Sequence, residues 1–206
     1  MLSAGETIIQ TSEATQEIPS GTFCVIPVYN NGGTIKDIAL RCRAILPDVV
    51  VVDDGSTDVD VADLLSETDI TVLRHEKNQG KGRALMTGLN YVREQNGTYM
   101  ISIDADGQHF PEDIPLFLPH LTPEADAIII GARDFSCDNI PGGSRFGRKF
   151  ASFWLKVETS KGMEDCQSGF RAYPVALIKQ LALTGRYYDF EAEILARASW
   201  AGLNLK

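Results

Sequence analysis

The sequence VVVVDDGS, residues 49–56, joins four β-branched residues to a run of turn-forming ones. An unbroken apolar run such as Val49 to Val52 is typical of a strand that is covered on both faces of a parallel sheet. Asp53 to Ser56 then favours a tight turn, because Asp, Gly and Ser are common turn residues. The stretch therefore predicts a buried strand that ends in an acidic loop.

On either side of this strand, short apolar runs alternate with helical patterns. Strands are predicted at residues 23–28, 49–52, 71–73, 99–103 and 126–130. Helices with one apolar face are predicted at residues 35–45, 83–92, 146–157 and 190–200. Asp58 and Asp60 mark the start of a further helix. Alternating strands and helices are the pattern of βαβ units, so the expected fold class is α/β, a three-layer sandwich with a mainly parallel sheet.

Length and composition are those of one ordinary domain. The chain has 206 residues, of which 44% are hydrophobic and 23% charged, enough for a sizeable core. With 28 acidic against 19 basic residues the net charge is −9, which disfavours nucleic acid as a partner. The four cysteines, at positions 24, 42, 137 and 166, form no CxxC pair and are expected to be reduced thiols.

The predicted organisation is a polar lead-in at residues 1–21 and a single domain at residues 22–206. The lead-in lacks the features of a secretory signal, and no apolar run is long enough to span a bilayer. Residues 203–206 begin a further strand, so we expect the domain to be truncated at its C-terminal end. The aromatic and basic residues of 146–157 fit either a buried helix or an amphipathic helix at a membrane interface.

Polar residues follow each of the first four predicted strands. In an open parallel sheet these strand ends meet at one edge, where ligands bind. The alternative is that each residue serves as a turn or helix cap. The residues concerned are Pro27, Tyr29 and Asn30, then Asp53 and Asp54, then Asn78 to Lys81, and finally Asp104, Asp106 and Gln108.

The sequence DADGQH, residues 104–109, is the sharpest of these candidate sites. Alternate residues of an extended segment point to the same side, so the carboxylates of Asp104 and Asp106 converge. Hard oxygen ligands of this kind suit Mg²⁺ or Mn²⁺ held jointly with a diphosphate. A calcium loop of the EF-hand type is excluded, because Gln108, His109 and Pro115 stand where Asp or Asn, Gly and Glu are needed.

Five motifs in order resemble those of family 2 glycosyltransferases with the GT-A fold. The resemblance is closest to the branch of polyprenyl-phosphate sugar transferases that contains the dolichyl-phosphate mannose synthases. It covers roughly residues 22–206. The motifs are VIPVYN at 25–30, VVDDGSTD at 51–58, NQGKGRAL at 78–85, DADGQH at 104–109 and QSGFRAYP at 167–174.

This resemblance implies an inverting, metal-dependent hexosyltransferase at the cytoplasmic face of a membrane, with a nucleoside-diphosphate sugar as donor and a polyprenyl phosphate as acceptor. Asp104, Asp106 and Gln108 would hold Mg²⁺ or Mn²⁺ and the donor diphosphate. The contacts to the nucleotide sugar would come from Pro27, Tyr29, Asn30, Asp53, Asp54 and Lys81. Arg133, Arg148 and Ser152 would grip the acceptor phosphate. The sequence departs from the family at Asn31-Gly32, where Asn-Glu often stands, and in the loop 135–143.

Three other functions compete with this one. Transfer to a sugar hydroxyl in cell-envelope glycan synthesis needs a general base, for which the candidate carboxylates are Asp165, Asp189, Glu191 and Glu193. A sugar-nucleotide binding module without activity would bind the donor and release no sugar. A nucleotidyltransferase is disfavoured, because no lysine or arginine follows Asn30 before Lys36.

Overall fold

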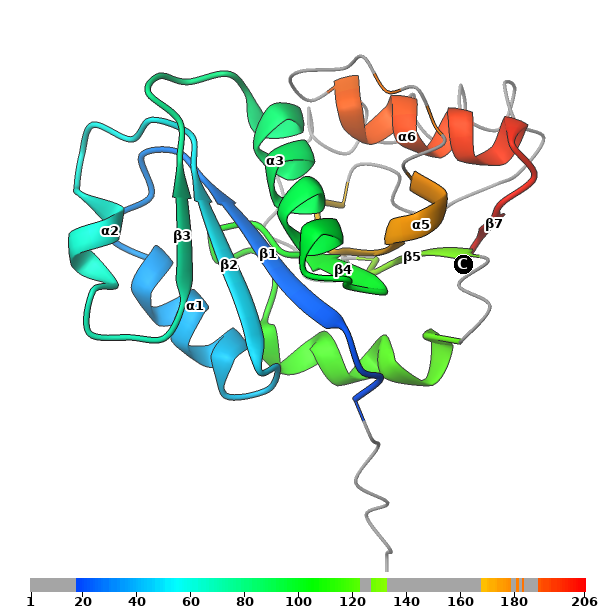
Figure 1. The fold of residues 1–206 in the computed structure, drawn as a ribbon, viewed down its shortest axis with the longest axis horizontal. Coiled ribbons are helices and arrows are strands. Elements are labelled where there is room, and N and C mark those ends of the chain that lie inside the picture. Colours follow the sequence, from blue (N-terminus) through cyan, green and yellow to red (C-terminus); the bar gives the residue numbers. More distant parts are fainter. Residues whose placement is uncertain (1–17, 123–126, 133–167, 179–180, 182, 184–188) are drawn as a thin grey trace, which may run out of the picture.

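A seven-stranded sheet forms the centre of the molecule (Figure 1). The computed structural model describes residues 18–122, 127–132, 168–178, 181, 183 and 189–206. The strand order is β3-β2-β1-β4-β6-β5-β7. The strands are β1 (Thr22–Val28), β2 (Asp48–Asp53), β3 (Thr71–Arg74), β4 (Tyr99–Ser102), β5 (Ala127–Ile130), β6 (Arg171–Pro174) and β7 (Asn204–Leu205).

The sheet is mainly parallel, as predicted. Strand β1 pairs in parallel with β2 and β4, β2 with β3, and β5 with β7. Strand β6 runs antiparallel to both of its neighbours, β4 and β5. This antiparallel strand was not predicted, although its residues belong to one of the sequence motifs.

Helices cover both faces of the sheet, which confirms the predicted three-layer α/β architecture (Figure 1). One face carries α3 (Lys81–Glu94), α5 (Val175–Ile178) and α6 (Asp189–Trp200). The other face carries α1 (Ile35–Arg43), α2 (Val61–Leu64) and the short 3₁₀ helices η1 (Pro111–Leu116) and η2 (Leu118–His120).

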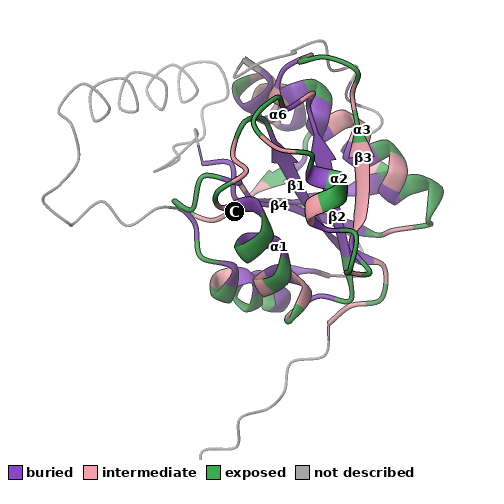
Figure 2. Ribbon diagram, turned by 90° about the vertical axis from the view of Figure 1, so that its left-hand side faces the viewer, coloured by how far each residue is buried: buried purple, intermediate pink, exposed green. Residues whose placement is uncertain are grey.

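Strand β1 shows how the two layers of core are built. All seven of its residues are buried. Cys24 and Ile26 pack into the core shared with α1, whereas Phe23 and Val25 pack into the core shared with α3. Because side chains alternate across a strand, a strand covered on both faces must be apolar at every position. Figure 2 shows the resulting buried centre and the exposed outer surfaces of the helices.

The helix boundaries follow local signals in the sequence. Helix α1 buries Ile35, Ile38, Ala39 and Cys42, the apolar face that the spacing predicted. Helix α2 begins at Asp60, whose carboxylate accepts hydrogen bonds from the backbone N–H groups of Ala62 and Asp63, at 3.0 and 3.1 Å. A carboxylate is a favoured N-cap because it satisfies backbone donors that the first turn leaves unpaired.

Several predictions fall partly or wholly outside the described residues, among them the helix at 146–157 and most of the lead-in. Cys24 and Cys42 are buried free thiols, and a hydrogen bond to Cys42, together with burial, raises the pKa of Cys24 well above its usual value. Among the described helices, none has the length and apolar character needed to cross a membrane.

Candidate active site at the strand ends

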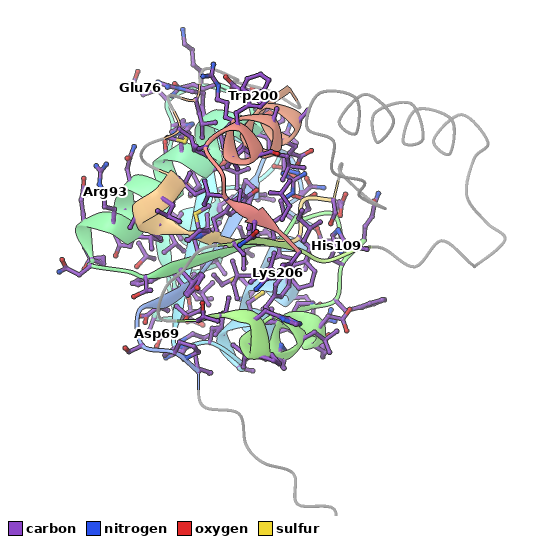
Figure 3. All side chains as sticks on the ribbon, turned by 90° about the vertical axis from the view of Figure 1, so that its right-hand side faces the viewer. Asp69, Glu76, Arg93, His109, Trp200 and Lys206 are labelled. Atoms are coloured by element: carbon purple, nitrogen blue, oxygen red, sulfur yellow. The ribbon has the colours of Figure 1, made fainter. Side chains whose placement is uncertain are left out.

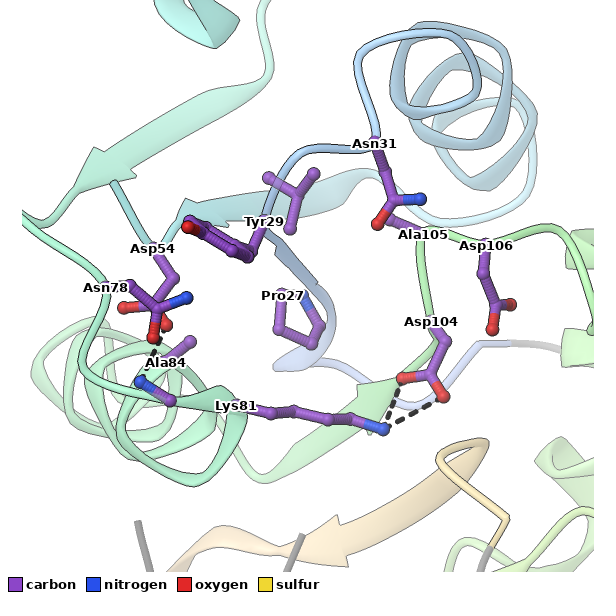
Figure 4. A pocket seen from close by; sticks show the side chains of 12 residues that line it. Pro27, Tyr29, Asn31, Asp54, Asn78, Lys81, Ala84, Asp104, Ala105 and Asp106 are labelled. Atoms are coloured by element: carbon purple, nitrogen blue, oxygen red, sulfur yellow. Dashed lines mark hydrogen bonds and ion pairs between the residues drawn. The ribbon is translucent and has the colours of Figure 1, made fainter. Parts of the chain in front are cut away.

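The carboxyl ends of the parallel strands surround a cavity of about 300 Å³, which we call the strand-end cavity (Figure 4). It lies where the loops after β1, β2, β3 and β4 meet, the edge of the sheet at which the sequence predicted a site. Its lining includes Pro27, Tyr29, Asn31, Asp54, Asn78, Lys81, Asp104 and Asp106.

Asp104 and Asp106 both line this cavity, as predicted from their spacing (Figure 4). The loop that carries them is held from two sides. The hydroxyl of Thr34 donates to the carbonyl oxygen of Ala105 at 2.5 Å, and the backbone N–H of Gln108 donates to Oδ1 of Asp106 at 2.9 Å. The two carboxylates therefore project from a tethered turn into one space.

The arrangement fits a divalent cation that is shared with a ligand. Within the described part of the chain, no group of three or more His, Cys, Asp or Glu residues forms a complete metal site. Mg²⁺ commonly uses only one or two protein carboxylates and completes its shell with phosphate oxygens and water. Asp104 and Asp106 supply two such carboxylates. Gln108, the third predicted ligand, is exposed and lines a neighbouring cavity.

The neighbouring cavity measures about 660 Å³ and is mostly apolar, with Phe110 and Phe117 in its lining. His109 and Lys206 also line it, and Figure 3 shows both on the same side of the molecule. The DADGQH loop therefore lies between two cavities. Asp104 and Asp106 line the strand-end cavity, and Gln108 and His109 line the apolar one.

Lys81 places an ammonium group between two carboxylates. Its Nζ lies 2.7 Å from Oδ1 and 2.9 Å from Oδ2 of Asp104, and 2.5 Å from Oε1 of Glu191. Burial opposes the charge of this ammonium, but attraction to Asp104 and Glu191 outweighs that effect and raises the pKa of Lys81. Lys81 therefore keeps its positive charge at the wall of the cavity.

Gly169 is a site residue whose role sequence reasoning missed. A Cβ atom at this position would lie 2.2 Å from Oδ2 and 2.5 Å from Oδ1 of Asp104. The hydroxyl of Ser102 donates to the carbonyl oxygen of Gly169 at 2.6 Å and holds the backbone in place. The motif QSGFRAYP contains this glycine, but only the fold shows that it makes room for the Asp104 carboxylate.

Asp54 lines the cavity, yet both of its oxygens already have partners. Oδ1 accepts from the backbone N–H of Gln79 at 2.9 Å and from Nδ1 of His75 at 2.6 Å, and Oδ2 accepts from the N–H of Gly80 at 2.8 Å. Nε2 of the same ring lies 2.9 Å from the hydroxyl of Thr87. Asp54 thus fixes the start of α3, where Lys81 stands, and both ring nitrogens of His75 have partners within the fold.

Asp53 is fully buried and lies behind the cavity wall. Its Oδ1 accepts from the N–H of Ser56 at 2.8 Å. Its Oδ2 has no hydrogen-bond partner in the described structure, although Nε of Arg74 lies 3.5 Å away. Asp53 therefore retains a buried oxygen that can accept a further hydrogen bond.

The end of β1 and the loop after it supply three of the predicted contacts. Pro27 and Tyr29 line the cavity, and 44% of the Tyr29 surface is exposed. Asn30 instead joins this loop to the loop after β2: its N–H donates to the Ser56 hydroxyl at 3.0 Å, and its Oδ1 accepts from the N–H of Thr57 at 2.8 Å.

The remaining predicted residues divide into two groups. Arg133, Arg148, Ser152 and Asp165 lie outside the described residues. Asp189 begins α6. The same helix carries Glu191, which reaches Lys81, and Glu193, which is ion-paired with Arg197 at 2.8 Å. Of the described side chains considered as a general base, only that of Glu191 reaches the charged groups of the cavity, through Lys81.

A surface ion pair holds η1, the element that follows the acidic loop, against α1. Nε and Nη2 of Arg41 donate to the two carboxylate oxygens of Glu112 at 2.8 and 2.5 Å. These hydrogen bonds lower the pKa of Glu112 to about 2. The pair is solvent-exposed, so it ties the two elements together without contributing much stability.

The chain is similar in sequence to a family model and to several known proteins. The family model described as glycosyl transferase family 2 matches residues 23–182. A UDP-N-acetylglucosamine–dolichyl-phosphate N-acetylglucosaminyltransferase of Methanococcus voltae is 27% identical over 89% of this chain and 82% of its own length. The polyprenol monophosphomannose synthase of Mycolicibacterium smegmatis is 28% identical over 90% of this chain and 74% of its own.

Among solved structures, the chain is similar to glucosyl-3-phosphoglycerate synthase from Mycobacterium tuberculosis in complex with Mn²⁺, UDP and glucosyl-3-phosphoglycerate. The TM-score is 0.67 and the sequence identity 22%, over 89% of this chain and 68% of that one. At this identity the match shows that the two proteins share a fold.

Proposed function

The chain belongs to glycosyl transferase family 2, and from this we propose that it transfers a hexose from a nucleoside-diphosphate sugar to a polyprenyl phosphate at the cytoplasmic face of a membrane. The reaction we propose is metal-dependent and inverts the anomeric centre. Residues 22–206 would form the single domain that carries it out.

The observation that carries this proposal is the meeting of Asp104, Asp106 and Lys81 in the strand-end cavity. Two carboxylates and one ammonium can hold a divalent cation and a diphosphate side by side. When bound, the cation would act as a Lewis acid that stabilises the charge on the leaving diphosphate, an effect worth on the order of several kcal/mol. Asp104 and Asp106 are the residues we assign to hold it.

The nucleotide would lie between the loops after β1 and β2. Tyr29 presents an exposed ring at this edge, and Pro27 lines the floor. Asp53, which is fully buried behind the cavity wall, would support the nucleotide indirectly, because its Oδ1 holds the loop after β2 through the N–H of Ser56 and its Oδ2 lies 3.5 Å from Nε of Arg74. Asp54 and Asn30 support this part of the site through the loops that they hold.

The ion pairs of Glu191 and Glu193 favour a phosphate acceptor over a hydroxyl acceptor. Glu191 already binds Lys81, and Glu193 already binds Arg197, so a hydroxyl acceptor would have to compete with an ion pair for its base. A phosphate is already anionic near neutral pH and needs positioning by cations. We assign that role to Arg133, Arg148 and Ser152. Two of the relatives are themselves named for dolichyl-phosphate or polyprenol acceptors.

The acceptor assignment is tested by direct competition between acceptor classes. The protein is incubated with Mn²⁺, a radiolabelled UDP- or GDP-sugar, and either undecaprenyl or dolichyl phosphate or a panel of sugar acceptors. We expect label to enter the lipid fraction only with a polyprenyl phosphate. Transfer to sugar hydroxyls alone would overturn the polyprenyl-phosphate assignment and leave the family assignment intact.

The site assignment is tested by Asp106→Asn. Asparagine retains the oxygen that accepts from Gln108 and removes the negative charge, so the turn is preserved. We expect transfer to fall at least about 10²-fold, in the range seen for loss of preorganised electrostatic groups. Asp63→Asn, on the exposed surface of α2, makes the same charge change away from the cavity and should leave transfer unaltered. Equal rates for the two variants would reject the site.

A further inference from the structure

Lys81 lies against the same carboxylate that we assign to the divalent cation. Its Nζ contacts both oxygens of Asp104, at 2.7 and 2.9 Å (Figure 4). It also contacts a second carboxylate, that of Glu191, at 2.5 Å. The side chain of Lys81 is 19% exposed and that of Glu191 only 8%. The ammonium is thus enclosed between two acidic partners at the wall of the cavity.

The two carboxylates are held by the fold. Asp104 packs against the backbone of Gly169, where even a methyl group would collide with it. Glu191 stands in the first turn of α6, and its carbonyl oxygen accepts at 2.9 Å from Nη1 of the fully buried Arg171. The Nε of the same guanidinium donates to the carbonyl of Ser168 at 2.7 Å. By contrast, the ammonium of Lys81 sits on a flexible four-carbon stem.

A divalent cation at Asp104 would therefore share this carboxylate with the ammonium of Lys81. Two cations at one carboxylate repel each other, and in a partly buried site solvent screens that repulsion weakly. A cation bound to Asp104 would thus push Lys81 away from this carboxylate, and Lys81 in turn would oppose binding of the cation. Glu191 keeps the released ammonium within the cavity, beside the space that the donor diphosphate would fill.

We infer that Lys81 is an internal counter-ion of Asp104. In the absence of ligand it neutralises the carboxylate, and it transfers to the donor diphosphate when cation and nucleotide bind, with Glu191 as its anchor. Cation and nucleotide then bind with positive coupling, because each relieves the Lys81–Asp104 contact that opposes the cation. The inference rests on the proposed function, since it takes Asp104 as a ligand of the cation.

The test measures binding of Mn²⁺ alone, by electron paramagnetic resonance of the free ion, with and without UDP or GDP. Without nucleotide, we expect Lys81→Gln to bind Mn²⁺ about tenfold more tightly than the wild type, and Lys81→Arg, which keeps the charge, to resemble the wild type. Lys77→Gln removes the same charge from the exposed loop before α3 and serves as the control. Nucleotide should tighten Mn²⁺ binding strongly in the wild type and only slightly in Lys81→Gln.

A double-mutant cycle separates this mechanism from a general effect of charge. Glu191→Gln leaves Asp104 as the one acidic partner of Lys81 among the described residues, so Mn²⁺ binding without nucleotide should weaken several-fold. In a Lys81→Gln background most of that effect should vanish, because there is no ammonium left to redirect. Additive effects in the cycle would overturn the counter-ion role, as would unchanged or weaker Mn²⁺ binding by Lys81→Gln. Thermal melts of each variant establish that it is folded.

The outcomes distinguish this inference from the proposed function. Should the wild type bind no Mn²⁺ with any nucleoside diphosphate, the proposed metal site fails, and the counter-ion role fails with it. Should the wild type bind Mn²⁺, Asp106→Asn lose it, and Lys81→Gln behave as wild type, then the metal site stands and only the counter-ion role is refuted.

Discussion

Gly169→Ala is the change for which the structure predicts the sharpest consequence. The added Cβ would lie 2.2 Å from Oδ2, 2.5 Å from Oδ1 and 2.6 Å from Cγ of Asp104. Ordinary van der Waals contact begins near 3.4 Å, so the carboxylate or the backbone has to move by more than 1 Å. The backbone is held by the Ser102 hydroxyl at 2.6 Å, and we therefore expect Asp104 to move.

The magnitude follows from two effects. Forcing an extra methyl group into a packed site costs about 1–3 kcal/mol of stability, which lowers the melting temperature by a few degrees in a domain of this size. A displacement of about 1 Å at a reacting centre can lower the rate about 10²-fold, equivalent to about 2.7 kcal/mol of activation free energy. We therefore expect a protein that is still folded but about 10²-fold less active.

The assay compares kcat/KM for the best donor of a panel of UDP-, GDP- and dTDP-sugars with thermal unfolding of the same preparation. Gly33→Ala is the matched control, because a Cβ there meets no atom within 4 Å. We expect wild-type activity from the control and a loss of about 10²-fold from Gly169→Ala. A Gly169→Ala protein with kcat/KM within threefold of the wild type would show that activity does not depend on the close packing of Asp104 against Gly169.

Two further predictions concern stability. Asp60→Ala removes the N-cap of α2 and should lower the free energy of unfolding by about 1 kcal/mol. Circular dichroism should then show a fall in Tm of about 2–4 °C. An unchanged Tm would mean that this cap does not stabilise the protein. Glu112→Gln removes the ion pair with Arg41. Because the pKa of Glu112 is lowered to about 2 in the fold, this pair stabilises the protein above pH ~4.5. The stabilisation is lost as the pH falls toward 2. The two proteins should therefore differ slightly in Tm at pH 7 and converge at acid pH, and a difference that persists at pH 2 would contradict the assignment.

The parts of the fold that were predicted correctly have a local signal. Strand β2 is an unbroken β-branched run, and α1 has a 3–4 spacing of apolar residues, so each pattern follows from burial on two faces or on one. Strand β6 has no such signal. Its four residues, Arg171–Pro174, include a fully buried arginine, which is stable there because carbonyl oxygens of Ser168 and Glu191 accept its hydrogen bonds. Those partners are brought together only by the fold.

The candidate site also combines features that the local sequence predicts with contacts that only the fold creates. The pairing of Asp104 with Asp106 was predictable, because the two residues are only two positions apart directly after a buried strand, although the structure forms a turn there and not the extended segment that we expected. The contact of Lys81 with Glu191 joins residues 110 positions apart, and nothing in the local sequence of either residue indicates it. The position of Asp54 at the cavity was predicted, but its hydrogen bonds were not. Its carboxylate accepts from Gln79, Gly80 and His75 and so organises the loop before α3.

We propose that Asp104 and Asp106 jointly hold the cation that neutralises the leaving nucleotide, and anomalous scattering from crystals grown with Mn²⁺ and a nucleoside diphosphate would locate that cation. We expect a manganese peak in the strand-end cavity, coordinated by at least one oxygen of this carboxylate pair and by oxygens of the diphosphate. A diphosphate bound in the cavity with no manganese beside those aspartates, or manganese bound only elsewhere, would contradict it.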